Sequence, residues 1–331
     1  MFFVIPKIRL TLHFKIRGSL KNNLTLILSV AFFLPCFGQV APIVIKGSQQ
    51  STIHRYNLPF NGYGQKTIDV WLPSKYPEAG PYDVLYMQDG QMLFDSTSNW
   101  NHQEWQADEV VSRLMAADSI RPVIIVGIWN AGTQRHSEYF PYKPLLNLSA
   151  SFRDSLQAQI VGENYKLFQT PIYSDSYLEF LVKTLKPFID RNYKVNPQSE
   201  HTIIGGSSMG GLISLYALCE YPGIFGAAIC MSTHWPGNFV LDNPDIPNAM
   251  LAYLRKNLPT DGKHKLYFDH GTEGIDSFYA VTQWKVDALL LTKNFGTNNY
   301  LSISFQGANH TERDWARRLH YPLNFILSKQ P

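Results

Sequence analysis

The sequence predicts an α/β fold with a mostly parallel central sheet, helices on both of its faces and antiparallel strands at its N-terminal edge. Short apolar runs alternate along the chain with longer segments in which apolar residues recur at three- and four-residue steps. Several of the short runs are continuously apolar, which is typical of strands covered on both faces. The chain has 331 residues, of which 45% are hydrophobic, enough for one large core.

The predicted elements follow one another in a regular strand–helix order. The predicted strands are residues 66–72, 83–88, 123–129, 201–204, 225–232, 265–269 and 301–305. The predicted helices are residues 104–116, 177–189, 212–219, 246–254, 281–291 and 315–327. Residues 49–72 show no helical pattern, so we expect antiparallel strands there, at one edge of the sheet.

One connection is unusually long. Residues 130–174 are rich in aromatic, proline and polar residues, and a connection of this length inside a compact domain is usually functional. We expect a single domain over residues 39–331, with residues 130–174 inserted as a lid or a wall of a pocket.

The N-terminal residues 1–38 predict a signal peptide. Basic residues precede an uncharged apolar stretch at 24–34, and small residues near Gly38 follow. An uncleaved anchor is the alternative, although the run is short for crossing a bilayer. We therefore expect a secreted or periplasmic protein with no stable membrane partner after the signal is removed.

Composition and motifs exclude several functions. The formal charge is +3 and no run of lysine or arginine is present, so nucleic acid is not an expected partner. Three cysteines do not form a disulfide scaffold, and Cys219 and Cys230 are expected to be buried free thiols. No Cys/His spacing predicts a metal site, and no phosphate-binding loop is present.

Residues 206–210 match the pattern G-x-S-x-G, with Ser208 at the centre. A predicted strand leads in and a predicted helix leads out, which is the context of a nucleophile held on a strained turn. The flanking glycines let neighbouring backbone pass closely, and the helix N-terminus favours a bound oxyanion. Ser207 does not fit, because Met209 lies two residues beyond it. The alternative is a glycine-rich turn without chemistry.

A serine needs a base, and in folds with this turn the chain order is serine, acid, histidine. His310 follows the last predicted strand and precedes the last helix, so its loop can reach the turn. The loop at 269–276 offers three carboxylates. Asp276, just ahead of a helix, is preferred as the acid that orients the imidazole. Glu273 and Asp269 remain open.

Two backbone amides are expected to form an oxyanion hole. One belongs to Met209, and the other to Gln91, which follows an Asp-Gly turn after an early strand. An ordinary turn is the alternative for Gln91. The pocket walls are predicted to include His234 and Trp235, after the fifth predicted strand, and Trp129, at the end of the third.

Four segments together resemble one family: LYMQDGQMLFD, GGSSMGG, GTEGID and GANHTERDW. In order and spacing, from about residue 50 to 328, they resemble the Putative esterase family of α/β-hydrolases. That family includes esterase D-type S-formylglutathione hydrolases, feruloyl and other carbohydrate esterases, enterochelin esterases and antigen 85 mycolyltransferases. The resemblance implies an α/β-hydrolase fold and catalysis without a metal or organic cofactor.

Residue by residue, the resemblance places the family's nucleophile on Ser208, its histidine on His310 and its early oxyanion donor on Gln91. Its acid falls on Asp276 if the loop carries a two-residue insertion, which keeps Glu273 open.

The function predicted from these residues is a secreted serine carboxylesterase that forms an acyl-enzyme. The expected substrate is a small-molecule or oligosaccharide ester of the feruloyl or acetyl type. An enterochelin-type siderophore esterase is one alternative, with Arg135, Lys143 and Arg153 as candidate cations for catecholates. A catalytically idle binding module is the other.

Overall fold

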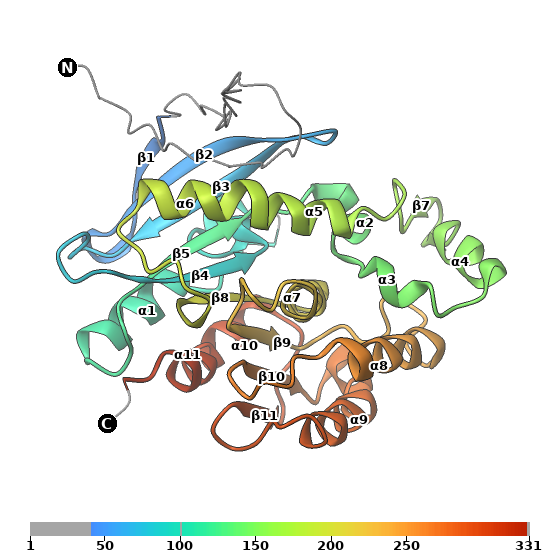
Figure 1. The fold of residues 1–331 in the computed structure, drawn as a ribbon. Helices are drawn as coiled ribbons and strands as arrows, with labels where there is room; N and C mark the ends of the chain where they lie inside the picture. Colours follow the sequence, from blue (N-terminus) through green and yellow to red (C-terminus); the bar gives the residue numbers. More distant parts are fainter. Residues whose placement is uncertain (1–40, 100, 330–331) are drawn as a thin grey trace, which may run out of the picture. The chain divides into compact units, whose positions relative to one another are not determined.

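The computed structural model describes residues 41–99 and 101–329, so the predicted signal peptide at 1–38 lies outside the described residues. A nine-stranded sheet forms the centre of this part of the chain, with the order β1-β2-β3-β5-β4-β8-β9-β10-β11 (Figure 1). Its strands are β1 (Ile43–Lys46), β2 (Thr52–Phe60), β3 (Gly64–Leu72), β4 (Asp83–Gln88), β5 (Val123–Ile128), β8 (Thr202–Ser207), β9 (Ala227–Met231), β10 (Lys265–Gly271) and β11 (Tyr300–Phe305).

The sheet is parallel from β5 through β11, while β1, β2 and β3 add antiparallel strands at the N-terminal edge. This confirms the predicted fold class. The seven strands predicted from the sequence all form. The edge begins earlier than predicted, because β1 precedes residue 49.

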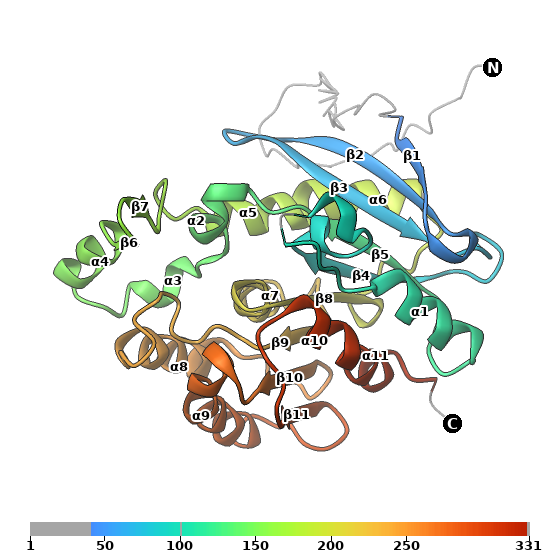
Figure 2. The same ribbon diagram turned by 180° about the vertical axis from the view of Figure 1, so that it is seen from behind.

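Helices cover both faces of the sheet (Figures 1 and 2). On one face lie α5 (Ser174–Phe180), α6 (Lys186–Asn192), α7 (Met209–Glu220), α8 (Asp245–Asn257) and α9 (Ala280–Leu291). On the other lie α1 (Ala107–Ala116), α10 (Glu312–Arg318) and α11 (His320–Leu327).

The two faces of the sheet bury two separate hydrophobic cores. Along β4, Val84 and Tyr86 point into the core beneath α5 to α9, whereas Leu85 and Met87 point into the core beneath α1, α10 and α11. This alternation is the period-two geometry of a strand. Because both faces are covered, the central strands can be apolar throughout, as the sequence has them.

Two predicted helices are interrupted, and a proline explains each break. Pro187 and Pro322 each lack an N–H to donate, and a proline ring clashes with the carbonyl four residues before it. The predicted helix 177–189 accordingly contains a π-helical segment, Leu181–Leu185, between α5 and α6. The predicted helix 315–327 is divided at Leu319 into α10 and α11.

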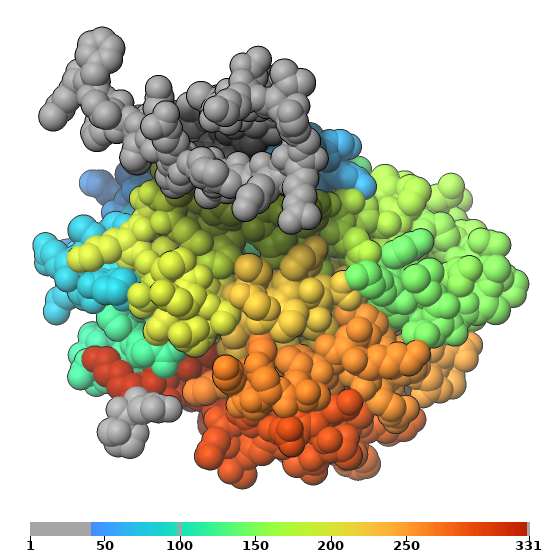
Figure 3. Space-filling view, in the orientation of Figure 1, coloured from blue at the N-terminus to red at the C-terminus, as the bar shows by residue number. Residues whose placement is uncertain are grey.

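The long connection at 130–174 contains short elements: α2 (Arg135–Tyr139), α3 (Tyr142–Leu145), α4 (Ala150–Gln157) and the hairpin of β6 (Ile160–Val161) and β7 (Tyr165–Lys166). Helices this short carry too few turns to leave a periodic signal in the sequence. The insertion follows β5 and packs against α8, where the green and orange surfaces meet in Figure 3.

Within residues 41–99 and 101–329, no helix combines the length and the apolar character that crossing a membrane requires.

Candidate active site

Ser208, Gln91, Asp276 and His310 all lie just beyond the carboxyl ends of parallel strands. Gln91 follows β4, Ser208 follows β8, Asp276 follows β10 and His310 follows β11. The carboxyl ends of parallel strands meet at one edge of a sheet, which is where α/β proteins place their ligand sites. Segments far apart in sequence therefore converge at this edge.

Ser208 occupies a strained turn between β8 and α7. Its backbone has φ of 58° and ψ of −124°, a region that side-chain-bearing residues rarely adopt. The turn is tight because a Cβ on Gly206 would lie 2.8 Å from Gln88 Cβ and 3.0 Å from the Gly210 carbonyl carbon. The glycine at position 206 is therefore a steric requirement of the turn.

Two backbone amides near this turn are left without partners. Met209 is the first residue of α7, and Gln91 lies in a 3-10 turn, Gly90–Met92. Among the described residues, neither N–H has a hydrogen-bond acceptor. Gly90 permits this turn, because a Cβ there would lie 2.4 Å from the Gly127 carbonyl carbon. Both amides are thus available to an acceptor that the chain does not supply.

The structure brings Asp276 against His310. Asp276 is fully buried, and its Oδ1 lies 2.5 Å from His310 Nδ1. Its Oδ2 accepts hydrogen bonds from the Gly271 N–H at 2.7 Å and from Ser232 Oγ at 2.6 Å. Burial works to raise the pKa of Asp276, but the bonds and charge of His310, with the other donors, lower it below its ordinary value. The carboxylate is therefore held ionised.

The other two candidate carboxylates do not reach His310. Glu273 is exposed, and its side chain has no hydrogen-bond or ion-pair partner among the described residues. Asp269 is buried on β10, where Tyr267 and Arg318 occupy its oxygens. The geometry leaves Asp276 as the carboxylate paired with this imidazole.

The His310 ring and Ser208 belong to one connected cluster. His310 packs edge-to-face on Tyr279 with the ring centroids 6.0 Å apart, and Tyr279 Oη lies 2.7 Å from His234 Nδ1. The His234 N–H donates to the Ser208 carbonyl at 3.2 Å. Ser208 Oγ itself has no hydrogen-bond partner among the described residues. Hydrogen bonds between a catalytic hydroxyl and its base are often long in ligand-free sites and tighten when substrate binds.

Ser232 is a central residue of the site that sequence reasoning missed. Besides donating to Asp276, its Oγ accepts hydrogen bonds from Trp315 Nε1 at 3.0 Å and from Arg318 Nη2 at 2.7 Å. Ser232 also has a positive φ of 42°. The one sequence signal was Trp315, inside the GANHTERDW segment, whose ring packs 4.9 Å from that of His310.

Arg318 supplies a buried positive charge beneath this cluster. It is 3% exposed, and its Nη2 lies 3.1 Å from Asp269 Oδ1 and 3.8 Å from Asp276 Oδ2. Burial raises the pKa of Asp269, and the Arg318 charge offsets part of that rise. Buried charges are tolerated when they are paired, so Arg318 balances two carboxylates that no water reaches.

The three predicted pocket-wall residues lie in positions that do not favour contact with a ligand. His234 and Trp235 are 3% and 1% exposed, and their polar atoms bond within the protein. Burial lowers the pKa of His234 to about 3, so this ring is neutral. Trp129 donates to Asp69 on β3 and carries Arg55 over its ring. Because β3 lies on the side of β5 away from β8, Trp129 points away from Ser208.

The insertion is bound to the loop that carries Gln91. Arg135 in α2 donates from Nε and Nη2 to the two carboxylate oxygens of Asp89, at 2.6 and 2.7 Å. Asn130 Nδ2 donates to the same carboxylate at 2.7 Å, and the Asn130 N–H donates to Gln91 Oε1 at 3.2 Å. A bidentate arginine–carboxylate pair fixes orientation as well as distance. The insertion therefore positions the Gln91 turn.

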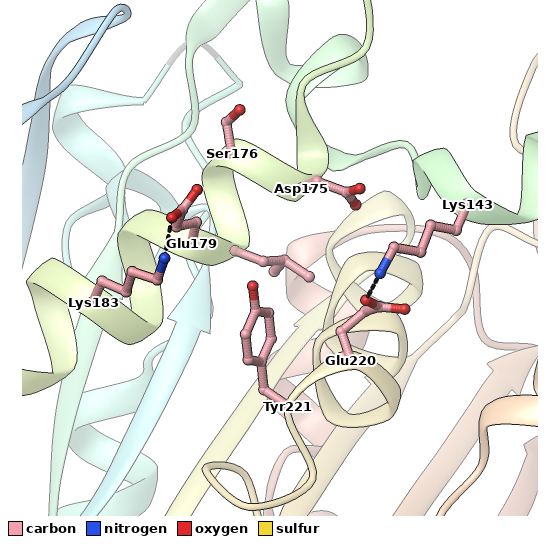
Figure 4. Close-up of a pocket in the computed structure, with 8 residues that line it drawn as sticks. Lys143, Asp175, Ser176, Glu179, Lys183, Glu220 and Tyr221 are labelled. Carbon is pink, nitrogen blue, oxygen red and sulfur yellow. Dashed lines mark hydrogen bonds and ion pairs between the residues drawn. The ribbon is translucent and has the colours of Figure 1, made fainter.

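The three cations considered for catecholate binding are engaged within the protein. Arg135 pairs with Asp89, Lys143 with Glu220, and Arg153 Nη1 donates to the Leu148 carbonyl at 2.7 Å. Figure 4 shows the Lys143–Glu220 pair in the wall of a cavity of about 280 Å³. This cavity lies at the C-terminal end of α7, whereas Ser208 precedes its N-terminal end.

No group of three or more His, Cys, Asp or Glu side chains among the described residues is arranged to hold a metal ion.

A sheet of this topology with a strained serine turn after a central strand is an α/β-hydrolase fold. The model of the Putative esterase family matches residues 64–320, and the chain belongs to that family.

Three relatives illustrate the range of similarity. The uncharacterized protein YbbA of Bacillus subtilis (strain 168) is 26% identical over 177 residues, which are 53% of this chain and 60% of YbbA. A feruloyl esterase module from Clostridium thermocellum, complexed with sinapinate, has a TM-score of 0.58 at 16% identity, covering 89% of this chain and 96% of that one. Enterochelin esterase from Shigella flexneri has a TM-score of 0.59 at 13% identity, covering 83% and 57%. The two structural matches establish the shared fold.

The turn makes a prediction about stability. Gly206→Ala is expected to lower the free energy of unfolding by about 1–3 kcal/mol, because the added methyl group overpacks against Gln88. Urea denaturation measures the loss. Gly223→Ala is the matched control, since a Cβ there meets nothing within 4 Å. Equal stability of the two variants would contradict the steric requirement.

The buried charge cluster makes a second prediction. Arg318→Met is expected to cost about 3–5 kcal/mol of unfolding free energy, because Asp269 is left buried without its cation. Arg317→Met, on the same helix but with a side chain 77% exposed, is expected to change it by less than about 1 kcal/mol. Adding Asp269→Asn to Arg318→Met should restore part of the loss. The free energies of unfolding of the two single variants and the double variant form a double-mutant cycle. If the losses of Arg318→Met and Asp269→Asn simply add in the double variant, the pairing is wrong.

Proposed function

We propose that this chain is a serine carboxylesterase in which Ser208 is the nucleophile, His310 the general base and Asp276 the residue that orients the imidazole. The observation that carries the proposal is a strained serine whose Oγ has no partner among the described residues. It lies at the same sheet edge as the hydrogen-bonded pair of buried Asp276 and partly exposed His310. A residue in a sparsely populated backbone region persists only where the surrounding structure enforces it, and such residues cluster at active sites.

The first step forms an acyl-enzyme. Ser208 Oγ attacks the ester carbonyl carbon while His310 Nε2 accepts the hydroxyl proton. The negative charge that develops on the carbonyl oxygen is stabilised by the N–H groups of Met209 and Gln91, which have no acceptor within the described chain. Each such donor typically contributes about 3 kcal/mol to lowering the barrier. The tetrahedral intermediate collapses, His310 returns the proton to the departing alkoxide, and the alcohol leaves.

The second step releases the acid. Water gives a proton to His310 Nε2 and adds to the acyl carbonyl, and the same two amides hold the new oxyanion. The proton then passes to Ser208 Oγ as the acid departs. Through both steps Asp276 stays ionised, which keeps Nδ1 of the imidazole protonated and Nε2 free to act as the base.

The proposed substrates are carbohydrate-linked esters, acyl groups of the feruloyl or acetyl type, outside the cytoplasm. Export is proposed from the signal pattern at 1–38. An aromatic cluster supports an aromatic acyl group: His136 and Phe168 meet edge-to-face at 5.0 Å, and Phe239, 55% exposed, lies 6.1 Å from His234. The His234 N–H donates to the Ser208 carbonyl, so His234 links the exposed Phe239 ring to the serine turn. We propose that Phe239 stacks on the ring of a bound aromatic acyl group.

The siderophore alternative has less support. Two of its candidate cations, Arg135 and Lys143, are already paired with carboxylates and do not offer free charge to catecholates. Arg153 keeps its charge, but its Nη1 is held by the Leu148 carbonyl.

The nucleophile is tested by comparing two adjacent serines. Ser208→Ala is expected to lower kcat for a p-nitrophenyl ester by about 10⁴-fold or more and to abolish labelling by a fluorophosphonate probe, read as an intact-mass increase. Ser207→Ala, a buried neighbour on β8, should keep both signals. Retained turnover and labelling in the Ser208 variant would refute the assignment. Absence of labelling in the unaltered protein would favour the idle binding module.

The substrate class is tested with feruloyl and acetyl sugar esters and a catecholate triester. Feruloyl and acetyl esters are expected to be hydrolysed in preference to the triester. Phe239→Ala should lower kcat/KM for the feruloyl ester by about two- to tenfold, the value of one aromatic contact, and leave the acetyl ester unchanged. Activity confined to the catecholate triester would overturn this substrate class.

A further inference from the structure

We propose that a groove between α1 and α10 binds an acidic carbohydrate, so that the enzyme selects esters carried on anionic saccharides. The carbohydrate part of this inference rests on the proposed function, whereas the anion site rests on the groove itself. The groove has a volume of about 560 Å³, within the usual range for small-ligand sites.

Arginine and histidine make up five of the eleven described residues that line the groove. Arg113 comes from α1, Arg313 and Arg317 come from α10, and His102 and His320 complete the set. Helices α1 and α10 lie on the same face of the sheet and share one hydrophobic core (Figure 2). Two chain segments separated by about two hundred residues thus present their arginines to one space.

The guanidinium groups are largely unneutralised. Arg113 and Arg313 have no side-chain hydrogen bond or ion pair among the described residues. Arg317 has one ion pair, 3.3 Å from Asp314, and its side chain is 77% exposed. Glu104 is the one carboxylate among the described lining residues, and burial and nearby Asp108 raise its pKa. Glu104 forms no ion pair with an arginine of the lining among the described residues.

The groove adjoins the proposed catalytic residues. Its first lining residue on α10, Arg313, comes three residues after His310 in the sequence. The Trp315 ring on the same helix packs against the Trp105 ring, with the two centroids 5.4 Å apart. On the other side, the Trp105 N–H donates to the Met92 carbonyl at 2.9 Å, next to Gln91. Asn101 Nδ2 joins the groove's loop to Glu312 at 2.9 Å. The groove lining and the proposed catalytic residues therefore lie on neighbouring segments of the chain.

The chemistry of the lining selects the ligand. Planar guanidinium groups match carboxylate and sulfate oxygens in bidentate geometry, and they retain their charge at any physiological pH. Gln103 and Gln106 add amide donors and acceptors suited to hydroxyl groups. Among the described residues, the lining contains no phenylalanine, tyrosine or tryptophan. The shared ligand chemistry is therefore an anionic group on a hydroxylated molecule, such as a uronate or a sugar sulfate.

Calorimetric titration of the full chain with trigalacturonate tests the site. This probe contains no ester, so binding is measured independently of hydrolysis. We expect trigalacturonate to bind, a neutral trisaccharide of the same length not to bind, and added salt to weaken binding, as for exposed charges. A sulfated neutral trisaccharide in a parallel titration distinguishes a carboxylate from a sulfate as the preferred anion.

The double variant Arg113→Gln and Arg313→Gln is expected to weaken trigalacturonate binding by about tenfold or more, the value of one charge-assisted contact. Arg255→Gln, on α8, is the control with the same type of charge removal on another face. Both variants should turn over p-nitrophenyl acetate like the unaltered protein.

Equal binding of the neutral trisaccharide, unchanged affinity in the double variant, or tighter binding of a single-stranded oligonucleotide would each overturn the site. If no form hydrolyses any ester while trigalacturonate still binds through these arginines, the proposed function fails and the anion site stands.

Discussion

Two carboxylates, Asp269 and Asp276, are completely buried at the edge of the sheet where the candidate active-site residues lie. Neither can remain ionised there without donors and positive charge. Arg318 and Tyr267 serve Asp269, while His310, Ser232 and the Gly271 amide serve Asp276. The placement of α10, which carries Arg318 and follows His310, is therefore tied to the electrostatics of this edge as well as to hydrophobic burial.

The parts predictable from sequence are those encoded locally. The G-x-S-x-G pattern itself predicts a tight turn, in which the residues flanking Ser208 must be glycines. The central strands are apolar because both of their faces are covered. Asp276, His310 and Gln91 could be nominated because the order of elements limits which loops reach one edge. The structure places these three residues at that edge, as predicted, whereas their chemical roles are tested by the experiments on Ser208.

What the sequence could not provide depends on contacts between distant segments. Nothing in the local sequence distinguishes Ser232, because its hydrogen-bond partners Asp276, Trp315 and Arg318 come from distant segments. Trp129 was nominated as a pocket wall from its position after β5, but the direction of its side chain is decided by Asp69 and Arg55 on neighbouring strands. The short helices of the insertion escaped detection because few turns leave little periodicity.

The insertion and the groove divide the surroundings of Ser208 into two sides. On one side, the Arg135–Asp89 pair ties the insertion to the Gln91 turn, with a buried Lys66–Glu138 pair beneath it. On the other, α1 and α10 present arginines to solvent. Between them α7 is buried along almost its whole length, so the serine turn rests on a rigid support. Substitutions in the insertion and in the groove can therefore change ligand specificity without disturbing the packing of α7.

The backbone angle at Ser208 has an evolutionary consequence. A positive φ costs energy for any residue with a Cβ and almost none for glycine. Selection for stability alone would therefore favour glycine at this position, and a functional role for the hydroxyl group would oppose that change. Under the proposed function, a glycine at this position in a related protein would indicate that the esterase activity has been lost.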